Sequence, residues 1–105
     1  MKIVGVAACT AGIAHTYMAR EKLMKGAKAR GHEAKIETQG TIGTEHKLTD
    51  QDILEADVVI LAVDVKISGE DRFKGKPVIR VGTAVVIKNA IGFIEKVEKA
   101  ISNKK

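Results

Sequence analysis

Two short, almost continuously apolar segments constrain the fold of this chain more than any other feature. Residues 2–8 read Lys-Ile-Val-Gly-Val-Ala-Ala, and residues 57–63 read Asp-Val-Val-Ile-Leu-Ala-Val. Apolar runs of this length without polar alternation are typical of strands buried on both faces, as in a parallel sheet. The 105 residues suit one compact core, so we expect a single domain over residues 1–105.

A helix is predicted after the first of these strands. Ala19, Leu23 and Ala27 recur every four residues and form its inner stripe. The helix is expected to continue to about Arg30, where Gly31 supplies a left-handed cap. This segment would cover one face of the sheet.

The next segment changes from helical spacing to strict alternation. Residues 33–38 place apolar and polar side chains on opposite sides, which predicts an edge strand. Its solvent side would carry Glu33, Lys35 and Glu37. Residues 39–43 contain two glycines and predict a turn.

The second half of the chain repeats the exchange of helix and strand. Thr49 can cap a short helix, with Asp52 as the acid of a capping box. One helical turn is expected over residues 69–73 and a fourth strand over residues 76–81. Gly82 and Thr83 then open a last helix, whose apolar spacing runs through Ile87, Ala90, Ile91, Ile94, Val97 and Ile101.

These elements define an α/β fold with an open four-stranded parallel sheet and helices on both faces. Right-handed crossovers and the edge position of the alternating strand predict the order 2-1-3-4, with strands numbered along the chain. The loop after the first strand then lies where the connections diverge to opposite faces. Ligands of open α/β sheets bind at this point, beyond the carboxyl ends of the strands.

Composition excludes several classes of function. The net charge of +5 is compatible with a mildly basic surface, but the only aromatic residues are Tyr17, Phe73 and Phe93. They are not interleaved with basic residues, so we expect no nucleic-acid partner. A single cysteine excludes an internal disulfide framework. No apolar run is long enough to cross a membrane, and we expect a cytoplasmic protein.

The single cysteine lies in the loop where a ligand is expected. Cys9 follows the first strand and precedes the first helix, whose amino-terminal N–H groups and dipole favour thiolate over thiol. The same N–H groups could surround a phosphoryl group on the sulfur. We therefore predict Cys9 as the catalytic residue. The predicted phosphate-binding residues are Thr10, Ala11, Gly12, Ile13, Ala14, His15 and Thr16.

The loop differs from that of the cysteine phosphatases at one informative position. The pattern Cys-x5-Arg places an arginine fork on the phosphate, whereas the sixth residue after Cys9 is His15. A loop that accepts phosphate without this arginine is expected to hold it and pass it on, as a carrier does. A low-molecular-weight phosphatase and a redox or regulatory thiol module remain the alternatives.

Other candidate sites give weaker signals. Cys9, His15, His32 and His46 match no common metal-binding spacing, and we expect neither a metal nor a cofactor. Four residues follow strands and would surround the cysteine loop as partner contacts, namely Gln39, Gly40, Asp64 and Thr83. The basic side of the first helix is either solvated or docks an acidic partner; it comprises Arg20, Lys22, Lys25, Lys28 and Arg30.

The loop resembles that of the fructose-type IIB domains of the bacterial sugar phosphotransferase system, which reads Cys-Pro-Thr-Gly-Ile-Ala-His-Thr. The chain matches this sequence at Cys9 and over residues 12–16, and the resemblance continues through Glu37-Thr38-Gln39-Gly40 and Gly75-Lys76-Pro77. Thr10-Ala11 replaces Pro-Thr, which restores one N–H and removes a fixed φ.

This resemblance implies a role for Cys9 in sugar uptake. Cys9 would receive a phosphoryl group from a phosphohistidine on a IIA partner. It would pass the group to fructose or a related hexose held by a membrane-embedded IIC partner. The resemblance also implies a four-stranded parallel sheet, and it places the domain in the cytoplasm at the inner face of the membrane.

Overall fold

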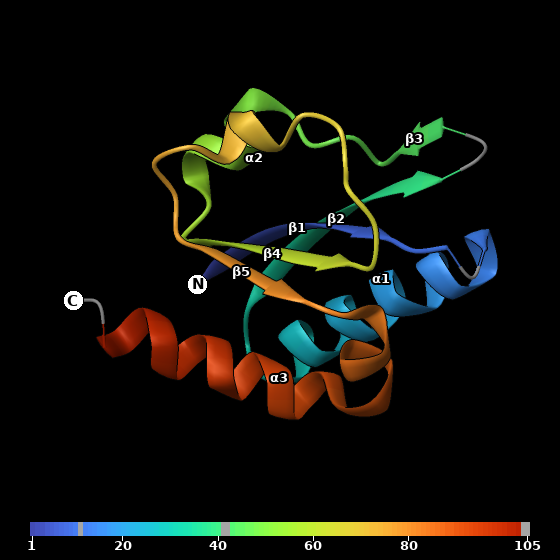
Figure 1. The fold of residues 1–105 in the computed structure, drawn as a ribbon. Helices are drawn as coiled ribbons and strands as arrows, with labels where there is room; N and C mark the ends of the chain where they lie inside the picture. Colours follow the sequence, from blue (N-terminus) through green and yellow to red (C-terminus); the bar gives the residue numbers. More distant parts are fainter. Residues whose placement is uncertain (11, 41–42, 104–105) are drawn as a thin grey trace.

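A computed structural model describes residues 1–10, 12–40 and 43–103 of the chain (Figure 1). Its central sheet has the order β3-β2-β1-β4-β5. A helix or helical turn separates each strand from the next along the chain, except between β2 and β3. The elements are β1 (Lys2–Ala8), α1 (Ile13–Ala29), β2 (Glu33–Gly40), β3 (Gly43–Glu45), α2 (Asp50–Glu55), β4 (Val58–Val63), the 3-10 turn η1 (Glu70–Phe73), β5 (Val78–Val81) and α3 (Thr83–Asn103).

The four long strands confirm the predicted parallel sheet and its order. β1 lies between β2 and β4, with Ile3 opposite both Ala34 and Val58, and β5 pairs with β4 in parallel. The prediction of only four strands was wrong, because β3 pairs antiparallel with the end of β2. The predicted turn over residues 39–43 is also corrected. β2 continues to Gly40 and β3 begins at Gly43, while residues 41–42 lie outside the described residues.

Helices cover both faces of the sheet, as the order of elements predicts. α1 and α3 pack side by side on one face, over Ile3, Ile60 and their neighbours. α2 and η1 lie on the other face, where Val6 and Leu61 are completely buried. This arrangement leaves the carboxyl ends of β1 and β4 accessible between the two layers.

The helices agree with the sequence predictions in most positions. Ala19, Leu23 and Ala27 are buried, and Thr49 and Asp52 form the predicted capping box. Ile91 is exposed, however, because it lies beside the buried stripe of α3 that runs through Val86, Ala90, Ile94 and Val97. Asn89 within this helix has a non-helical backbone. No helix within the described ranges is long and apolar enough to cross a membrane.

The alternating strand is less exposed than its pattern indicates. Glu37 was expected on a solvent side of β2, but its side chain is completely buried. β3 covers the end of β2 at one edge, and Arg72 of η1 forms an ion pair with the Glu37 carboxylate. The edge-strand prediction is therefore wrong at the end of β2 where β3 pairs.

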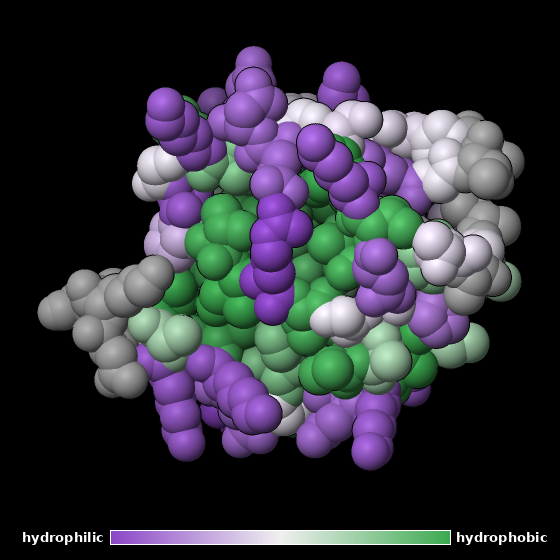
Figure 2. All heavy atoms as spheres, in the orientation of Figure 1, coloured by the Kyte–Doolittle hydropathy of each residue, from purple (hydrophilic) through white to green (hydrophobic). Residues whose placement is uncertain are grey.

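The basic surface predicted for α1 is only partly free. Lys22, Lys25 and Lys28 are exposed, whereas Arg20 donates a hydrogen bond to the carbonyl of Ile36. Arg30 forms an ion pair with Glu98 of α3. Figure 2 shows a separate apolar area near the centre of the view, crossed by a hydrophilic side chain and with further hydrophilic side chains above and below it.

Candidate functional site

Cys9 lies where the topology places a ligand site, directly after β1 and before α1. Strand pairing puts the end of β1 between the ends of β2 and β4, so the Cys9 loop lies at the centre of the carboxyl edge. The thiol is free and partly exposed. A reactant can therefore reach the sulfur while the sheet fixes the position of its main chain.

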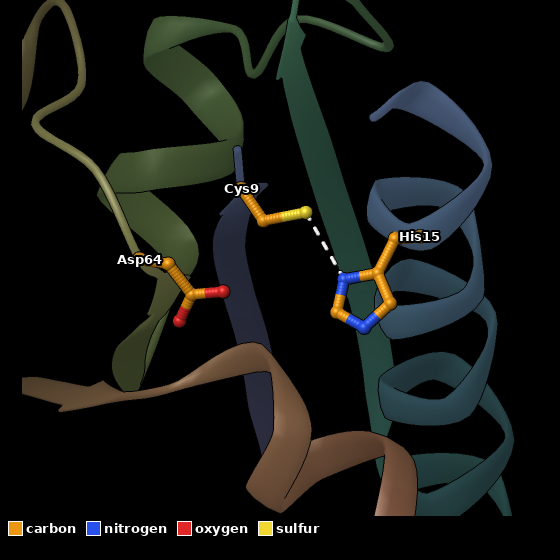
Figure 3. A group of neighbouring side chains, drawn as sticks. All are labelled: Cys9, His15 and Asp64. Atoms are coloured by element: carbon orange, nitrogen blue, oxygen red, sulfur yellow. Dashed lines mark hydrogen bonds between the residues drawn. The ribbon is translucent and has the colours of Figure 1, made fainter. Parts of the chain in front are cut away.

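Two side chains from the first turn of α1 contact the sulfur. Cys9 Sγ lies 3.0 Å from His15 Nδ1 and 3.6 Å from Thr16 Oγ1 (Figure 3). Because the imidazole nitrogen can donate or accept a proton, it can take the thiol proton or donate a hydrogen bond to the thiolate. Thr16 is buried, and its hydroxyl also lies 3.3 Å from the carbonyl of Gly12. Both contacts suit a sulfur that changes its charge.

Gly12 turns the chain from the cysteine loop into α1. It is the N-cap residue, with φ 116° and ψ 171°, a conformation open almost only to glycine. Residues 9–16 were expected to form a loop, but this expectation is wrong over its second half, because α1 already begins at Ile13. The first turn of a helix leaves N–H groups without intrahelical partners, and α1 begins only four residues after Cys9.

A second pair of residues joins the site from β4 and α3. Asp64 follows β4 and accepts a hydrogen bond from the backbone N–H of Thr83, at 3.1 Å from Oδ1. The buried Thr83 hydroxyl donates to Oδ2 of the same carboxylate and lies 3.5 Å from His15 Nδ1. Thr83 therefore holds the Asp64 carboxylate next to the imidazole of His15.

Cys9, His15 and Asp64 thus form one cluster from three different elements. Their sulfur, nitrogen and oxygen atoms all lie within 4.8 Å of one another. Figure 3 shows the three side chains directed toward a common space. The other two histidines considered with Cys9 do not belong to this cluster. His32 contacts Glu98 and the amino terminus, and His46 is exposed next to β3.

The remaining predicted site residues differ in their exposure and in their partners within the chain. Thr10, Gly12 and Ala14 are exposed around the cysteine loop. Ala11 and the side chain of Ile13 lie outside the described residues. The Gln39 amide bonds the backbone of Ser68 through both its oxygen and its nitrogen, at 2.9 and 3.0 Å. Gln39 thus already has partners within the chain, and Gly40 is exposed beside it.

Sequence reasoning missed a polar network beside this site. Both oxygens of buried Glu37 accept hydrogen bonds from Arg72, at 2.8 and 2.6 Å, and further bonds come from Gln39 and the Leu48 N–H. Burial raises the pKa of the Glu37 carboxyl, but the bonds from Arg72, Gln39 and Leu48 outweigh it and lower the pKa overall. The Glu-Thr-Gln-Gly sequence was the one available signal, because its glutamate precedes a predicted turn.

None of the four arginines substitutes for the missing phosphatase arginine. Arg20 bonds the Ile36 carbonyl, Arg30 bonds Glu98, and Arg72 bonds Glu37. Arg80 forms an ion pair with Glu70. The fold and the site therefore define an α/β domain with a partly exposed cysteine that has no arginine clamp within the described residues.

Comparisons with known proteins identify the family of this domain. A family model described as "PTS system, Lactose/Cellobiose specific IIB subunit" matches residues 4–99. The PTS system fructose-like EIIB component 2 of Escherichia coli K12 is 50% identical over 97 residues, which cover 92% of each chain. The chain thus belongs to the IIB family of the phosphotransferase system (PTS).

A solved structure and a larger relative agree with this assignment. The solution structure of an Enzyme IIB subunit of the PTS system from Escherichia coli K12 has a TM-score of 0.91 and 40% identity, covering 98% of this chain and 95% of that chain. A PTS system fructose-specific EIIB'BC component of Vibrio cholerae is 44% identical over 87 residues, which are 83% of this chain and 15% of the relative. In that relative, a IIB-like segment is part of a much longer chain.

Proposed function

We propose that this domain carries a phosphoryl group on Cys9 during sugar uptake. In the first step, a phosphohistidine on a IIA partner donates the group, so that its N–P bond breaks and an S–P bond forms on Cys9. In the second step, the S–P bond breaks as a hydroxyl of the sugar forms an O–P bond and loses its proton. The domain is then a phosphotransferase that uses a phosphocysteine intermediate.

The observation that carries this proposal is the position of the Cys9 sulfur at the start of α1. The sulfur lies 3.0 Å from His15 Nδ1, so the imidazole can hold the thiol proton and leave a nucleophilic thiolate. The helix start supplies N–H groups and a positive dipole end for the charged oxygens of the phosphoryl group. Catalysis of phosphoryl transfer needs mainly such positioning and charge stabilisation. Ala11, Ile13 and Ala14 would contribute through their backbone N–H groups, and Thr10 through its hydroxyl.

The names of the relatives support the proposed partners and substrate. Fructose appears in the names of the Escherichia coli and Vibrio cholerae relatives, and the latter name joins IIB and IIC components. We infer a IIA phosphohistidine as donor and a sugar on a membrane IIC partner, fructose or a related hexose, as acceptor. The domain would then act in the cytoplasm, at the inner face of the membrane, without a metal or a cofactor.

The four residues predicted as partner contacts differ in whether a partner could reach them. Asp64 and Gly40 are exposed beside the cysteine loop and remain candidates for contact. Thr83 is buried and the Gln39 amide bonds Ser68, so these two act more directly by shaping the site.

Intact mass at neutral pH tests the proposal. The protein would be incubated with phosphoenolpyruvate, the general phosphotransferase proteins and a fructose-type IIA, beside Cys9→Ser. We expect the wild type alone to gain one phosphoryl group, and addition of IIC membranes with fructose to remove it. A gain retained by Cys9→Ser would place the group elsewhere and contradict the proposal.

The same samples distinguish the alternative functions. Steady release of phosphate from an aryl phosphate, without a stable mass gain, would favour a phosphatase. Oxidation of Cys9 by peroxide without phosphorylation by any donor would favour a redox thiol. His46→Asn is a suitable control, because His46 is exposed away from the cluster and has a positive φ that asparagine tolerates.

A further inference from the structure

The cluster of Cys9, His15 and Asp64 has a donor set that phosphoryl transfer alone does not require. A thiol, an imidazole and a carboxylate are all ligands of Zn²⁺, whereas Mg²⁺ and Ca²⁺ prefer oxygen ligands only. The three donor atoms lie within 4.8 Å of one another and come from the end of β1, the start of α1 and the end of β4. We propose that Cys9, His15 and Asp64 bind a Zn²⁺ ion that blocks the reactive sulfur.

The distances are compatible with one ion between the three side chains. Zn²⁺ binds sulfur at about 2.3 Å and nitrogen or oxygen at about 2.0–2.2 Å, so neighbouring ligand atoms lie roughly 3.3–3.6 Å apart. The Cys9–His15 contact of 3.0 Å would open slightly, and the Asp64 carboxylate would move inward. Both changes are small movements of side chains, because the three ligand atoms already lie within 4.8 Å of one another.

The surroundings of Asp64 support its role as a ligand. Its two oxygens accept hydrogen bonds from the N–H and the hydroxyl of Thr83, and each oxygen keeps a free lone pair. Such outer hydrogen bonds orient carboxylates in metal sites. Asp64 is exposed and Cys9 is partly exposed, so an ion can enter from solvent and a fourth position stays open.

Binding of the ion and phosphorylation exclude each other at the sulfur. As the Zn–S bond forms, the thiol proton is released to solvent and no electron is transferred. A phosphoryl group on Cys9 would remove this ligand, and a bound ion would remove the nucleophile. The block of transfer rests on the function proposed above, whereas binding of Zn²⁺ to the free thiol does not.

Titration with Co²⁺ as a spectroscopic substitute for Zn²⁺ tests the site on the unphosphorylated protein. We expect a near-ultraviolet sulfur-to-cobalt charge-transfer band that one equivalent of Zn²⁺ removes. Cys9→Ser should abolish the band. Thr83→Val should weaken binding about 10-fold or more, because it removes the hydroxyl donor, one of the two outer hydrogen bonds to Asp64. Asp64→Asn should weaken binding at least as much. A wild-type protein without this band would overturn the proposal.

Matched controls and a second readout separate this site from a thiol that binds metal unaided. Asp71→Asn and His46→Asn change an exposed carboxylate and an exposed imidazole outside the cluster, and should leave the Co²⁺ affinity unchanged. Zn²⁺ should protect Cys9 from alkylation by iodoacetamide, and a chelator should reverse this protection. Equal affinity in the wild type, Asp64→Asn and His15→Ala would show binding by the thiol alone and overturn the three-residue site.

These measurements use no donor protein and no sugar. A phosphorylated Cys9 without Co²⁺ binding by the free thiol would retain the proposed function and exclude the metal site. Co²⁺ binding without phosphorylation would retain the metal site and exclude the proposed function.

Discussion

Cys9 directly follows β1 and Glu37 lies within the neighbouring strand β2, but the surroundings of the thiol and the carboxylate differ completely. Glu37 on β2 is buried, and Arg72, Gln39 and the Leu48 N–H donate to its carboxylate. Cys9 after β1 is partly exposed, and among the described residues its sulfur contacts the His15 imidazole, the Thr16 hydroxyl and the Gly12 carbonyl.

This difference separates a polar group that holds the structure from one that can react. A carboxylate with all its acceptor positions in use stays charged and has no capacity left for a ligand. A sulfur with two adaptable partners can gain and lose a charged group without leaving a buried ion unpaired. The Glu37 network therefore fixes the loop around Ser68 through Gln39, while the Cys9 thiol stays partly exposed.

Removal of Arg72 should have the largest effect on stability, because it leaves the buried Glu37 carboxylate without its charged partner. Arg72→Met should lower the free energy of unfolding by about 3–5 kcal/mol. Urea unfolding monitored by circular dichroism measures this change. Arg80→Met is the matched control, since the Arg80–Glu70 pair is exposed, and should cost less than about 1 kcal/mol. Equal losses of unfolding free energy in the two variants would contradict the distinction between the buried Arg72–Glu37 pair and the exposed Arg80–Glu70 pair.

Removal of His15 should have the opposite signature, with a large effect on transfer and a small one on stability. His15→Ala should slow phosphoryl uptake by about 10²-fold, because the sulfur loses its proton acceptor and hydrogen-bond donor. Rapid-quench mass spectrometry of phosphoryl uptake gives the rate. His46→Asn should retain the wild-type rate. An unchanged rate in His15→Ala would assign the imidazole a structural role only.

The same contrast explains what could be predicted from the sequence. The parallel sheet followed from the apolar runs at 2–8 and 57–63, and the position of Cys9 followed from the strand order. The contact with His15 was within reach because His15 is only the sixth residue after Cys9, in the first turn of α1. Local patterns of this kind report burial and position well.

The polar network of Glu37 could not be predicted from such local patterns. Alternation in residues 33–38 assigns Glu37 to solvent, and its partner Arg72 lies 35 residues away in a short turn. Burial of this glutamate is set by that tertiary contact and by β3, a strand of three residues that carries almost no periodic signal. The role of Thr83 in holding Asp64 depends likewise on two elements that meet only in the folded chain.

A smaller effect is expected from Gly12, which shapes the Cys9 loop through its backbone alone. A Cβ at this position would meet nothing within 4 Å, so the cost of Gly12→Ala comes from φ 116° and ψ 171°. We expect a loss of about 1–3 kcal/mol in stability and slower phosphoryl uptake.

Gly75→Ala is the matched control for Gly12→Ala. Gly75 has φ 89° and equally open space, but it precedes β5 on a different loop. It should lose comparable stability and keep the wild-type rate of uptake. Slower uptake in both variants would attribute the effect to general destabilisation rather than to the cysteine loop.

The smallest effects concern carboxylates that, like Glu37, are held charged by their partners but lie at the surface. Hydrogen bonds from Arg30 and then His32 lower the pKa of Glu98 to about 2 from 4.5. The Thr49 N–H and then Lys35 lower that of Asp52 to about 2 from 3.8. Because each pKa is lower in the folded state, its stabilisation is complete above the unfolded value and is lost as the pH falls toward 2.

Urea midpoints measured between neutral pH and pH 2 test this assignment. We expect a nearly constant midpoint above about pH 5 and a decline below it, to which buried Glu37 also contributes. Glu98→Gln should lower the midpoint at neutral pH and make the decline shallower, since one carboxyl no longer takes up a proton. Because Glu98 is partly exposed to solvent, its contribution to the pH dependence of stability is small. Arg72→Met should therefore flatten the decline more strongly. A steeper decline in Glu98→Gln would show that the folded state does not hold this carboxyl charged.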